Sequence, residues 1–500
     1  MTEHSSEPHP PIVSVAAGQV RGLSDGTVRR FLGIPYAAPP TGANRFREPQ
    51  PVQPWSGVRD ATRPGPAAPH RIRPFPKLDV VPLVGTGGEA GDDYLALNVW
   101  APEGARGLPV MVFVHGGGFV LGSKDASVSD GTALARSGVV CVAINYRLNI
   151  DGFLPIAGVP TNLGLRDMIA ALQWVRDNIA AFGGDPDNVT LFGESAGAMA
   201  TANLVASPLA TGLFRRAIVQ SGHGSMVRQI SVARRLVDGL ARLLKVAPDA
   251  AGFASVPFDR VWPAIEKAGK PMGGVDLRDP QGFEPVYGIS RFIPVYGDDV
   301  LPEHPLRALE GGAGRDVDLL IGSNAEEMNL YFVPTGVRRR IPRFFARWLL
   351  GRSTPHASRA LQAYGLGSGK RPGEAMTEAM SDLVFRWPAR QFAAAHTGRT
   401  HVYEFEWRSP ACDGELGACH GIELPFVFDT LSTVTGPRGL AGENPPQELA
   451  DRVHRLWVDF ARDGSLPWAE FHADSRQVYK LDAGVAAAEP VMPAAAFTPN

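Results

Sequence analysis

The sequence predicts an α/β protein with a large, mostly parallel central sheet flanked by helices. Three observations lead to this prediction. Short apolar runs that suit buried strands alternate with longer helical segments, a Gly-Glu-Ser-Ala-Gly turn stands between one strand and one helix, and a glycine cluster follows an earlier strand. Alternation of this kind is typical of parallel sheets whose strands are connected by helices.

Apolar runs predict buried strands at residues 109–114, 139–146, 189–192 and 217–220. Between them, residues 165–182 predict a helix, because its apolar residues recur on one face: Leu165, Ile169, Leu172, Val175 and Ile179. A further strand is expected at 402–407, and residues 230–246 and 377–395 are interpreted as helical insertions.

Length and composition favour one large catalytic unit. With 500 residues and 44% apolar content, the chain can bury an extensive core. We expect a disordered polar tail over residues 1–11, one domain over 12–480, and a C-terminal tail over 481–500. The first eleven residues are polar and proline-rich and lack the apolar segment of a signal peptide.

Charge and cysteine content exclude several classes of function. A net charge of −2 gives no reason to expect a nucleic-acid partner. Cys141, Cys412 and Cys419 match no common zinc spacing and are expected to be free thiols, so we predict no metal, no cofactor and a cytoplasmic location. The sequence contains no run of 18 apolar residues, so no membrane span is expected.

Ser195 is the candidate nucleophile. It lies in a Gly-x-Ser-x-Gly pattern directly after the apolar run 189–191 and directly before the helix-compatible segment 198–204. Such a sharp strand-to-helix turn lifts the serine hydroxyl clear of the sheet and directs a helix N-terminus at developing negative charge. A glycine-rich turn that merely contains serine is the alternative, and the flanking strand and helix argue against it.

A second glycine cluster supplies candidate donors for an oxyanion. His-Gly-Gly-Gly-Phe at residues 115–119 follows the strand predicted at 109–114. Consecutive glycines let backbone N–H groups approach a tetrahedral oxyanion, so we expect Gly117, Gly118 and the N–H of Ala196 to form the oxyanion hole. A plain turn is the alternative, but three glycines are costly there because each loses extra backbone entropy on folding.

A serine nucleophile needs a base and an acid, and in this architecture the chain order is Ser, acid, His. Among eight downstream histidines, His420 stands out because it lies in a loop of small residues after the strand predicted at 402–407. The acid should also follow a strand, and the segment 319–327 offers Glu326 and Glu327. The pattern alone does not choose between these two carboxylates.

Many ordered motifs resemble the type-B carboxylesterase family, which also contains the cholinesterases. The resemblance runs from about residue 13 to about residue 471. It includes segments 31–37, 97–100, 115–119, 145–148, 162–167, 183–186 and 420–426, and the Gly-x-Ser-x-Gly turn at residues 193–197, which we call the elbow. It implies the α/β-hydrolase fold with helical insertions over the active site. The family pattern Gly-x-Asn-x-x-Glu falls on Gly322, Asn324 and Glu327, so the resemblance implies Glu327 as the triad acid, with His420 as base and Ser195 as nucleophile.

Two departures from the family narrow the expected substrates. Where many secreted members have Glu-Asp-Cys-Leu, this chain has Asp92-Asp93-Tyr94-Leu95, so that disulfide cannot form. No tryptophan lies between Trp55 and Trp100, where cholinesterases hold a quaternary ammonium group by cation–π attraction. A choline ester is therefore a poor candidate.

These observations predict a serine carboxylesterase that hydrolyses uncharged small or medium esters, its small-molecule partners, through an acyl-enzyme. The alternatives are a lipase or an amide or carbamate hydrolase with the same triad, and a non-catalytic binding module, against which the intact triad argues.

Glu194 either adds negative potential that favours the imidazolium or has a structural role. The arginine- and aromatic-rich segment 338–350 is interpreted as a helix with its arginines in water, with contact to a lipid interface as the alternative.

Overall fold

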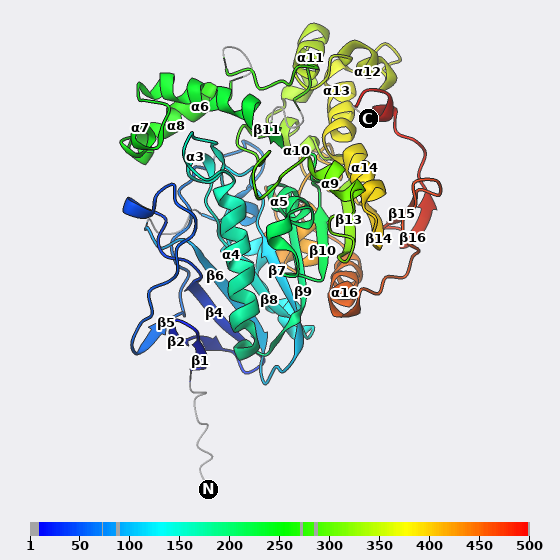
Figure 1. Ribbon diagram of the computed structural model, residues 1–500. Coiled ribbons are helices and arrows are strands. Elements are labelled where there is room, and N and C mark those ends of the chain that lie inside the picture. Colours follow the sequence, from blue (N-terminus) through cyan, green and yellow to red (C-terminus); the bar gives the residue numbers. More distant parts are fainter. Residues whose placement is uncertain (1–9, 73, 87–90, 271–273, 285–288, 499–500) are drawn as a thin grey trace.

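The computed structural model describes residues 10–72, 74–86, 91–270, 274–284 and 289–498, and its centre is an eleven-stranded sheet (Figure 1). In spatial order, the strands of this sheet are β16 (Val485–Ala488), β15 (Gln477–Lys480), β14 (Thr400–Phe405), β13 (Asp318–Asn324), β10 (Arg216–Gln220), β9 (Gly184–Glu194), β7 (Leu108–Val114), β8 (Val140–Ile144), β6 (Ala96–Pro102), β4 (Val28–Pro35) and β3 (Leu23–Ser24).

The central strands of this sheet are parallel, as the sequence predicts. Neighbouring strands run parallel from β8 through β7, β9, β10, β13 and β14 to β15. The pairs at the two edges are antiparallel. Two small sheets accompany it, one of β1 (Ile12–Val15), β2 (Gly18–Arg21) and β5 (Val58–Asp60), and one of β11 (Arg228–Gln229) and β12 (Val295–Tyr296).

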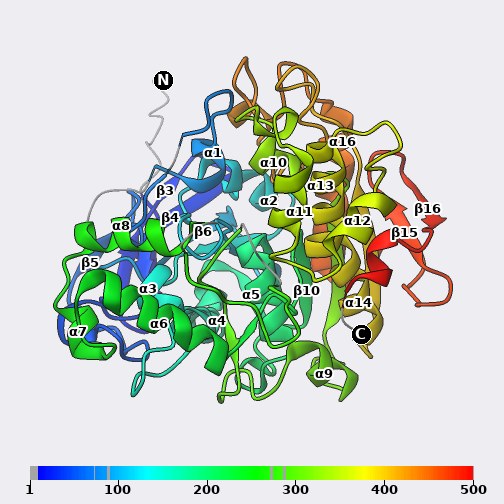
Figure 2. The ribbon, with the colours of Figure 1, turned by 90° about the horizontal axis from the view of Figure 1, so that it is seen from above.

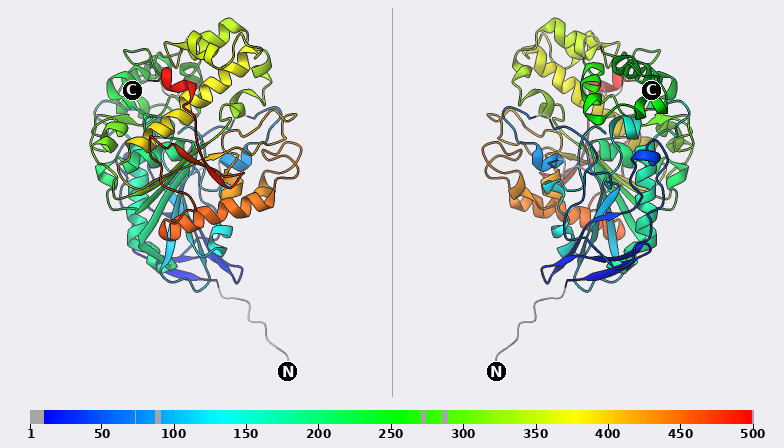
Figure 3. Two further views of the ribbon diagram at one scale, coloured as in Figure 1. Left: turned by 90° about the vertical axis from the view of Figure 1, so that its right-hand side faces the viewer. Right: turned by 90° about the vertical axis from the view of Figure 1, so that its left-hand side faces the viewer.

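Both faces of the sheet are covered by helices. Along β7, Val110 and Val112 pack into one apolar cluster and Met111 and Phe113 into another, because successive strand residues point to opposite faces. The first cluster includes side chains of α4 (Leu163–Asn178) and α5 (Ala196–Val205), and the second includes those of α2 (Thr132–Arg136) and α16 (Gln447–Asp463). Figure 3 shows α16, in orange, on the opposite side of the sheet from α4 and α5.

The remaining helices lie mainly in the connections between strands. They are α1 (Val81–Val84), α3 (Asn149–Phe153), α6 (Ile230–Leu244), α7 (Ala250–Ala254), α8 (Phe258–Ala268), α9 (Pro305–Glu310), α10 (Asn329–Phe332), α11 (Arg343–Leu350), α12 (Ala357–Ala363), α13 (Pro372–Ser381), α14 (Trp387–Ala395) and α15 (Leu424–Val427). Figure 2, a view from above, shows α6–α8 on one side of α5 and α10–α13 on the other. None of the helices in the described part of the chain is long and apolar enough to cross a membrane.

The helix expected at 377–395 is interrupted. Helix α13 ends at Ser381, a π-helical turn, η6, follows over Asp382–Arg386, and α14 begins at Trp387 with a proline in its first turn. Pro388 lacks a backbone N–H and cannot continue the hydrogen-bond ladder of the preceding turns, and a π-turn accommodates the break.

The C-terminal tail expected over residues 481–500 is corrected by the structure. Strand β16 pairs antiparallel with β15, so the sheet continues beyond residue 480. Glu489, Ala494 and Phe497 are buried, which explains why this segment is ordered although β16 is short and its residues are exposed. Of the expected N-terminal tail, residues 1–9 lie outside the described residues, and β1 begins at Ile12.

The arginine-rich segment contains the short 3-10 helix η5 (Val337–Arg339) and α11. Helix α11 buries Ala346, Leu349 and Leu350 and exposes Arg343 and Arg347, as expected for a helix with its arginines in water. Phe344, 74% exposed, lies on the solvent side of this helix.

Candidate active site

Ser195 occupies a sharp turn between β9 and α5. Its backbone has φ 56° and ψ −120°, a region that side-chain-bearing residues rarely adopt. The turn is held because the Ser195 N–H donates to the carbonyl of Gln220 at 2.9 Å. A Cβ on Gly197 would stand 1.9 Å from the carbonyl oxygen of Val114, so only glycine allows the helix and β7 to approach this closely.

The glycine cluster lies directly against this turn. A Cβ on Gly116 would stand 2.5 Å from the Glu194 carboxylate and 3.1 Å from the Ser195 Cβ. Gly117 and Gly118 have φ of 106° and 62°, so both occupy backbone conformations that favour glycine. Within the described residues, the N–H groups of Gly117, Gly118 and Ala196 donate no hydrogen bond, which leaves them available to an oxyanion.

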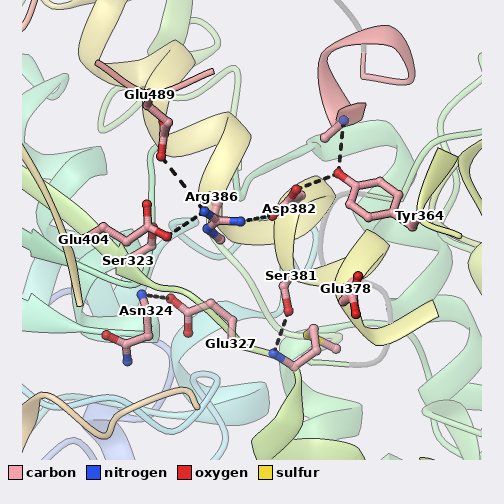
Figure 4. Close-up of polar contacts among 12 residues, drawn as sticks. Ser323, Asn324, Glu327, Tyr364, Glu378, Ser381, Asp382, Arg386, Glu404 and Glu489 are labelled. Carbon is pink, nitrogen blue, oxygen red and sulfur yellow. Dashed lines mark hydrogen bonds and ion pairs between the residues drawn. The ribbon is translucent and has the colours of Figure 1, made fainter. Parts of the chain in front are cut away.

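Of the two carboxylates that the sequence leaves open, Glu327 faces His420. Its Oε2 lies 2.6 Å from Nδ1 of His420. Its Oε1 accepts a hydrogen bond from the Asn324 N–H at 2.7 Å, a contact that Figure 4 shows. Glu326 instead accepts from the Ala418 N–H at 3.0 Å and forms an ion pair with Arg408. Glu327 lies three residues after Asn324, the last residue of β13, and its carboxylate points toward Asn324 and His420.

His420 is held by aromatic rings and by the backbone. Its ring centroid lies 4.8 Å from that of Phe385 and 5.6 Å from that of Tyr331. The backbone N–H of His420 donates to the backbone carbonyl of Glu327 at 3.2 Å. Phe385 belongs to the π-helical turn η6, so the interruption between α13 and α14 brings an aromatic ring against the histidine.

The other ring nitrogen of His420 lies next to Glu194. Its Nε2 is 3.1 Å from Oε1 of Glu194, but the orientation is not that of a hydrogen bond. The described residues contain no hydrogen bond between Ser195 and His420, although both side chains border the same cavity. Hydrogen bonds between catalytic groups often shorten only when substrate is bound.

The two carboxylates change the protonation of the histidine. Burial opposes a charged ring, but the charges of Glu194 and Glu327 outweigh it and raise the pKa of His420 to about 9. Burial likewise raises the pKa of Glu194 to about 8. A proton is therefore retained between Glu194 and His420 at neutral pH.

A second layer of buried polar groups supports the triad candidates. The Asn324 side chain donates to Glu423 at 2.6 Å and to the carbonyl of Cys419 at 2.8 Å, and Gln220 donates to Glu423 at 3.1 Å. These bonds join the ends of β13 and β10 to the segment that carries His420. Burial raises the pKa of Glu423.

Ser195 and His420 open into a cavity of about 770 Å³ with a mainly apolar wall. Its apolar lining includes Leu83, Val120, Trp262, Ile265, Phe292, Leu330, Leu349 and Leu424. A cavity of this size and character suits a small or medium organic molecule. Among the described residues, no cluster of histidine, cysteine, aspartate or glutamate has the arrangement of a metal site, and the three cysteines are free.

Comparison with known proteins identifies the family, since residues 9–492 match the Carboxylesterase family. The chain belongs to this family. It is 34% identical to para-nitrobenzyl esterase of Bacillus subtilis, with 95% of each chain covered, and 34% identical to phenmedipham hydrolase of Pseudarthrobacter oxydans, with 94% of each covered. The solved carboxylesterase of Geobacillus stearothermophilus superposes with a TM-score of 0.79 at 31% identity, over 96% of this chain and 98% of the other.

Membership of the carboxylesterase family explains the architecture described above. The fold is the α/β-hydrolase fold, with the elbow at the end of β9 and helical connections above the sheet. The protein is a carboxylic ester hydrolase. Helices α8, α10 and α11 each contribute side chains to the cavity wall, as the resemblance implies for insertions over the active site.

Proposed function

We propose that the protein is a serine carboxylesterase with Ser195 as nucleophile, His420 as base and Glu327 as the acid that orients the base. The observation that carries this proposal is the 2.6 Å contact between His420 Nδ1 and Glu327 Oε2 beside a cavity that Ser195 also lines. A carboxylate at Nδ1 fixes the tautomer that leaves Nε2 free to accept the serine proton.

In the first half of the reaction, His420 takes the proton of Ser195 as its oxygen attacks the ester carbonyl carbon. The carbonyl oxygen becomes an oxyanion, for which the N–H groups of Gly117, Gly118 and Ala196 are the proposed donors. The carbon–oxygen bond to the alcohol then breaks, and His420 returns the proton to the leaving oxygen. In the second half, water repeats the sequence on the acyl-enzyme and releases the acid.

The cavity supports uncharged esters of small or medium size as substrates. Its wall is mainly apolar, and its volume of about 770 Å³ lies in the range typical of sites for small organic molecules. Para-nitrobenzyl esterase, by its name, acts on an uncharged aromatic ester, which is consistent with this class.

A second candidate activity is the hydrolysis of carbamates or amides by the same groups. The relative named phenmedipham hydrolase favours it, because its similarity covers 94% of both chains. The two activities share the acylation step and differ in the leaving group and in the stability of the acyl-enzyme.

Labelling with a fluorophosphonate tests the proposal directly. We expect the wild-type protein to be labelled and the Ser195→Ala variant to remain unlabelled. A panel of p-nitrophenyl esters of increasing acyl length, with one carbamate of the same alcohol, then separates the two candidate activities. A wild-type protein that neither reacts with the probe nor hydrolyses any ester contradicts the proposal and favours a non-catalytic binding role.

We also propose a cytoplasmic location and a small-molecule ester as partner, without nucleic acid. The net charge of −2 and the three free thiols support both proposals. Fractionation of cells that produce the protein tests the location.

A further inference from the structure

Tyr331 contributes an aromatic ring with a hydroxyl group to the wall of the active-site cavity. It belongs to α10, which begins two residues after Glu327, and it lines the same cavity as Ser195 and His420. Its ring centroid lies 5.6 Å from that of His420, and the two ring planes are inclined by 40°. The turn that carries the proposed acid therefore also carries a phenol beside the proposed base.

The hydroxyl of Tyr331 keeps its proton in the cavity that Ser195 also lines. Burial raises the pKa of Tyr331 well above its usual value, and the charges of Glu194 and Glu327 act in the same direction. The Ser195 side chain lowers this pKa in part, and both residues line the same cavity. The Tyr331 hydroxyl is therefore protonated at neutral pH and can donate a hydrogen bond within the cavity.

During the reaction, two oxygen atoms are available as acceptors for a hydrogen bond from a donor in this cavity. In the tetrahedral intermediate, the Ser195 Oγ and the alkoxy oxygen of the ester are bound to the same carbon. The Oγ then becomes an ether-type oxygen and accepts hydrogen bonds poorly. The alkoxy oxygen gains negative charge as its bond to carbon breaks, which makes it the better acceptor.

We propose that Tyr331 is a further catalytic residue, whose hydroxyl donates a hydrogen bond to the alkoxy oxygen as the alcohol leaves. The bond between the carbonyl carbon and that oxygen breaks, the electron pair stays on the oxygen, and His420 supplies the proton. Tyr331 keeps its own proton throughout. This inference rests on the proposed function of Ser195 and His420.

The Tyr331→Phe variant tests the role, because phenylalanine retains the ring against His420 and removes only the donor. Charge on the leaving oxygen is larger for an alcohol of high pKa, so the donor matters more for ethyl acetate than for p-nitrophenyl acetate. We expect kcat/KM to fall about tenfold for ethyl acetate and by less than about twofold for p-nitrophenyl acetate. Titration of active sites with a fluorophosphonate normalises the rates to functional protein.

Tyr364→Phe is the matched control. The Tyr364 hydroxyl donates to Asp382 at 2.6 Å and accepts from the Ala494 N–H at 3.1 Å, and its side chain is not part of the cavity wall. We expect this variant to change both esters by the same factor. If Tyr331→Phe slows both esters equally, or neither, the role of Tyr331 is overturned while wild-type labelling and hydrolysis stand. If the wild type shows neither labelling nor hydrolysis, the proposed function fails as well.

Discussion

The Nε2 atom of His420 lies 3.1 Å from Oε1 of Glu194, at the end of the imidazole ring opposite to Glu327. The ring is thus placed between two buried carboxylates, and its charged form is favoured over its neutral form. A general base works only when it is unprotonated, so this placement sets the pH at which the enzyme becomes active.

We predict that Glu194→Gln moves the acidic limb of the pH profile to lower pH. The pKa of His420 is about 9 with the Glu194 charge present, and loss of that charge lowers it toward the ordinary value for histidine. Activity then appears at lower pH, because the neutral ring forms earlier. The measurement is kcat/KM for an uncharged ester between about pH 5 and pH 10. Glu326→Gln, whose carboxylate pairs with Arg408, should leave the limb in place, and an unmoved limb in Glu194→Gln contradicts the prediction.

Glu327→Gln should reduce kcat by about 10³- to 10⁴-fold, because a neutral amide at Nδ1 no longer fixes the tautomer or stabilises the imidazolium. Glu326→Gln should change kcat little, since that carboxylate contacts Arg408 and the Ala418 N–H instead of the histidine. Steady-state kinetics on one p-nitrophenyl ester is sufficient. Similar losses in both variants would mean that the wrong carboxylate has been assigned.

Gly117→Ala should reduce kcat by about 10²-fold, because a Cβ at this position would lie 2.1 Å from the carbonyl oxygen of Leu121 and force the loop to move. Gly104→Ala is the control, since Gly104 also has a positive φ of 69° but its Cβ would meet nothing within 4 Å. Both variants are strained in the backbone. Only the first should lose turnover, and a comparable loss in Gly104→Ala would show that backbone strain alone accounts for the effect.

The C-terminal segment should contribute measurably to stability through Glu489. Its Oε1 lies 2.9 Å from Nη2 of Arg390 and 3.9 Å from Nη2 of Arg386. Both arginines also form ion pairs with Glu404 of β14, and Figure 4 shows Arg386 between Glu404 and Glu489. Glu489→Ala leaves buried arginines with incomplete pairing and should lower the free energy of unfolding by about 3 to 5 kcal/mol. Denaturant unfolding measures the change.

The control for this prediction is Glu303→Ala, which removes an exposed ion pair between Glu303, just before α9, and Arg307 of α9. Exposed pairs contribute about 0 to 1 kcal/mol, so little change is expected. Equal effects of the two substitutions would contradict the role assigned to the buried network.

The parts of the fold that follow from local pattern were predictable. The apolar run at 109–114 is β7, the run at 139–146 contains β8, and the elbow has the strand and helix that its glycines require. These signals are local, because periodicity and glycine content act within a few residues. The short, exposed strand β16 has no such signal, and its place in the sheet depends on pairing with β15.

The candidate site was predictable only where motifs carried it. Glu327 and His420 follow from chain order and family resemblance, and the structure brings their side chains together. The positions of Phe385 and Glu423 follow from packing between distant segments, so the sequence did not reveal them. Tyr331 had one usable signal, its place four residues after Glu327 in the turn that follows β13.

The backbone at Ser195, with φ 56° and ψ −120°, is one that glycine adopts freely and serine adopts at a cost of about 1 to 3 kcal/mol. Replacement by glycine would relieve this cost and remove the nucleophile in the same step. Selection for heat resistance alone would therefore discard this serine, and only the requirement for turnover keeps it in the chain.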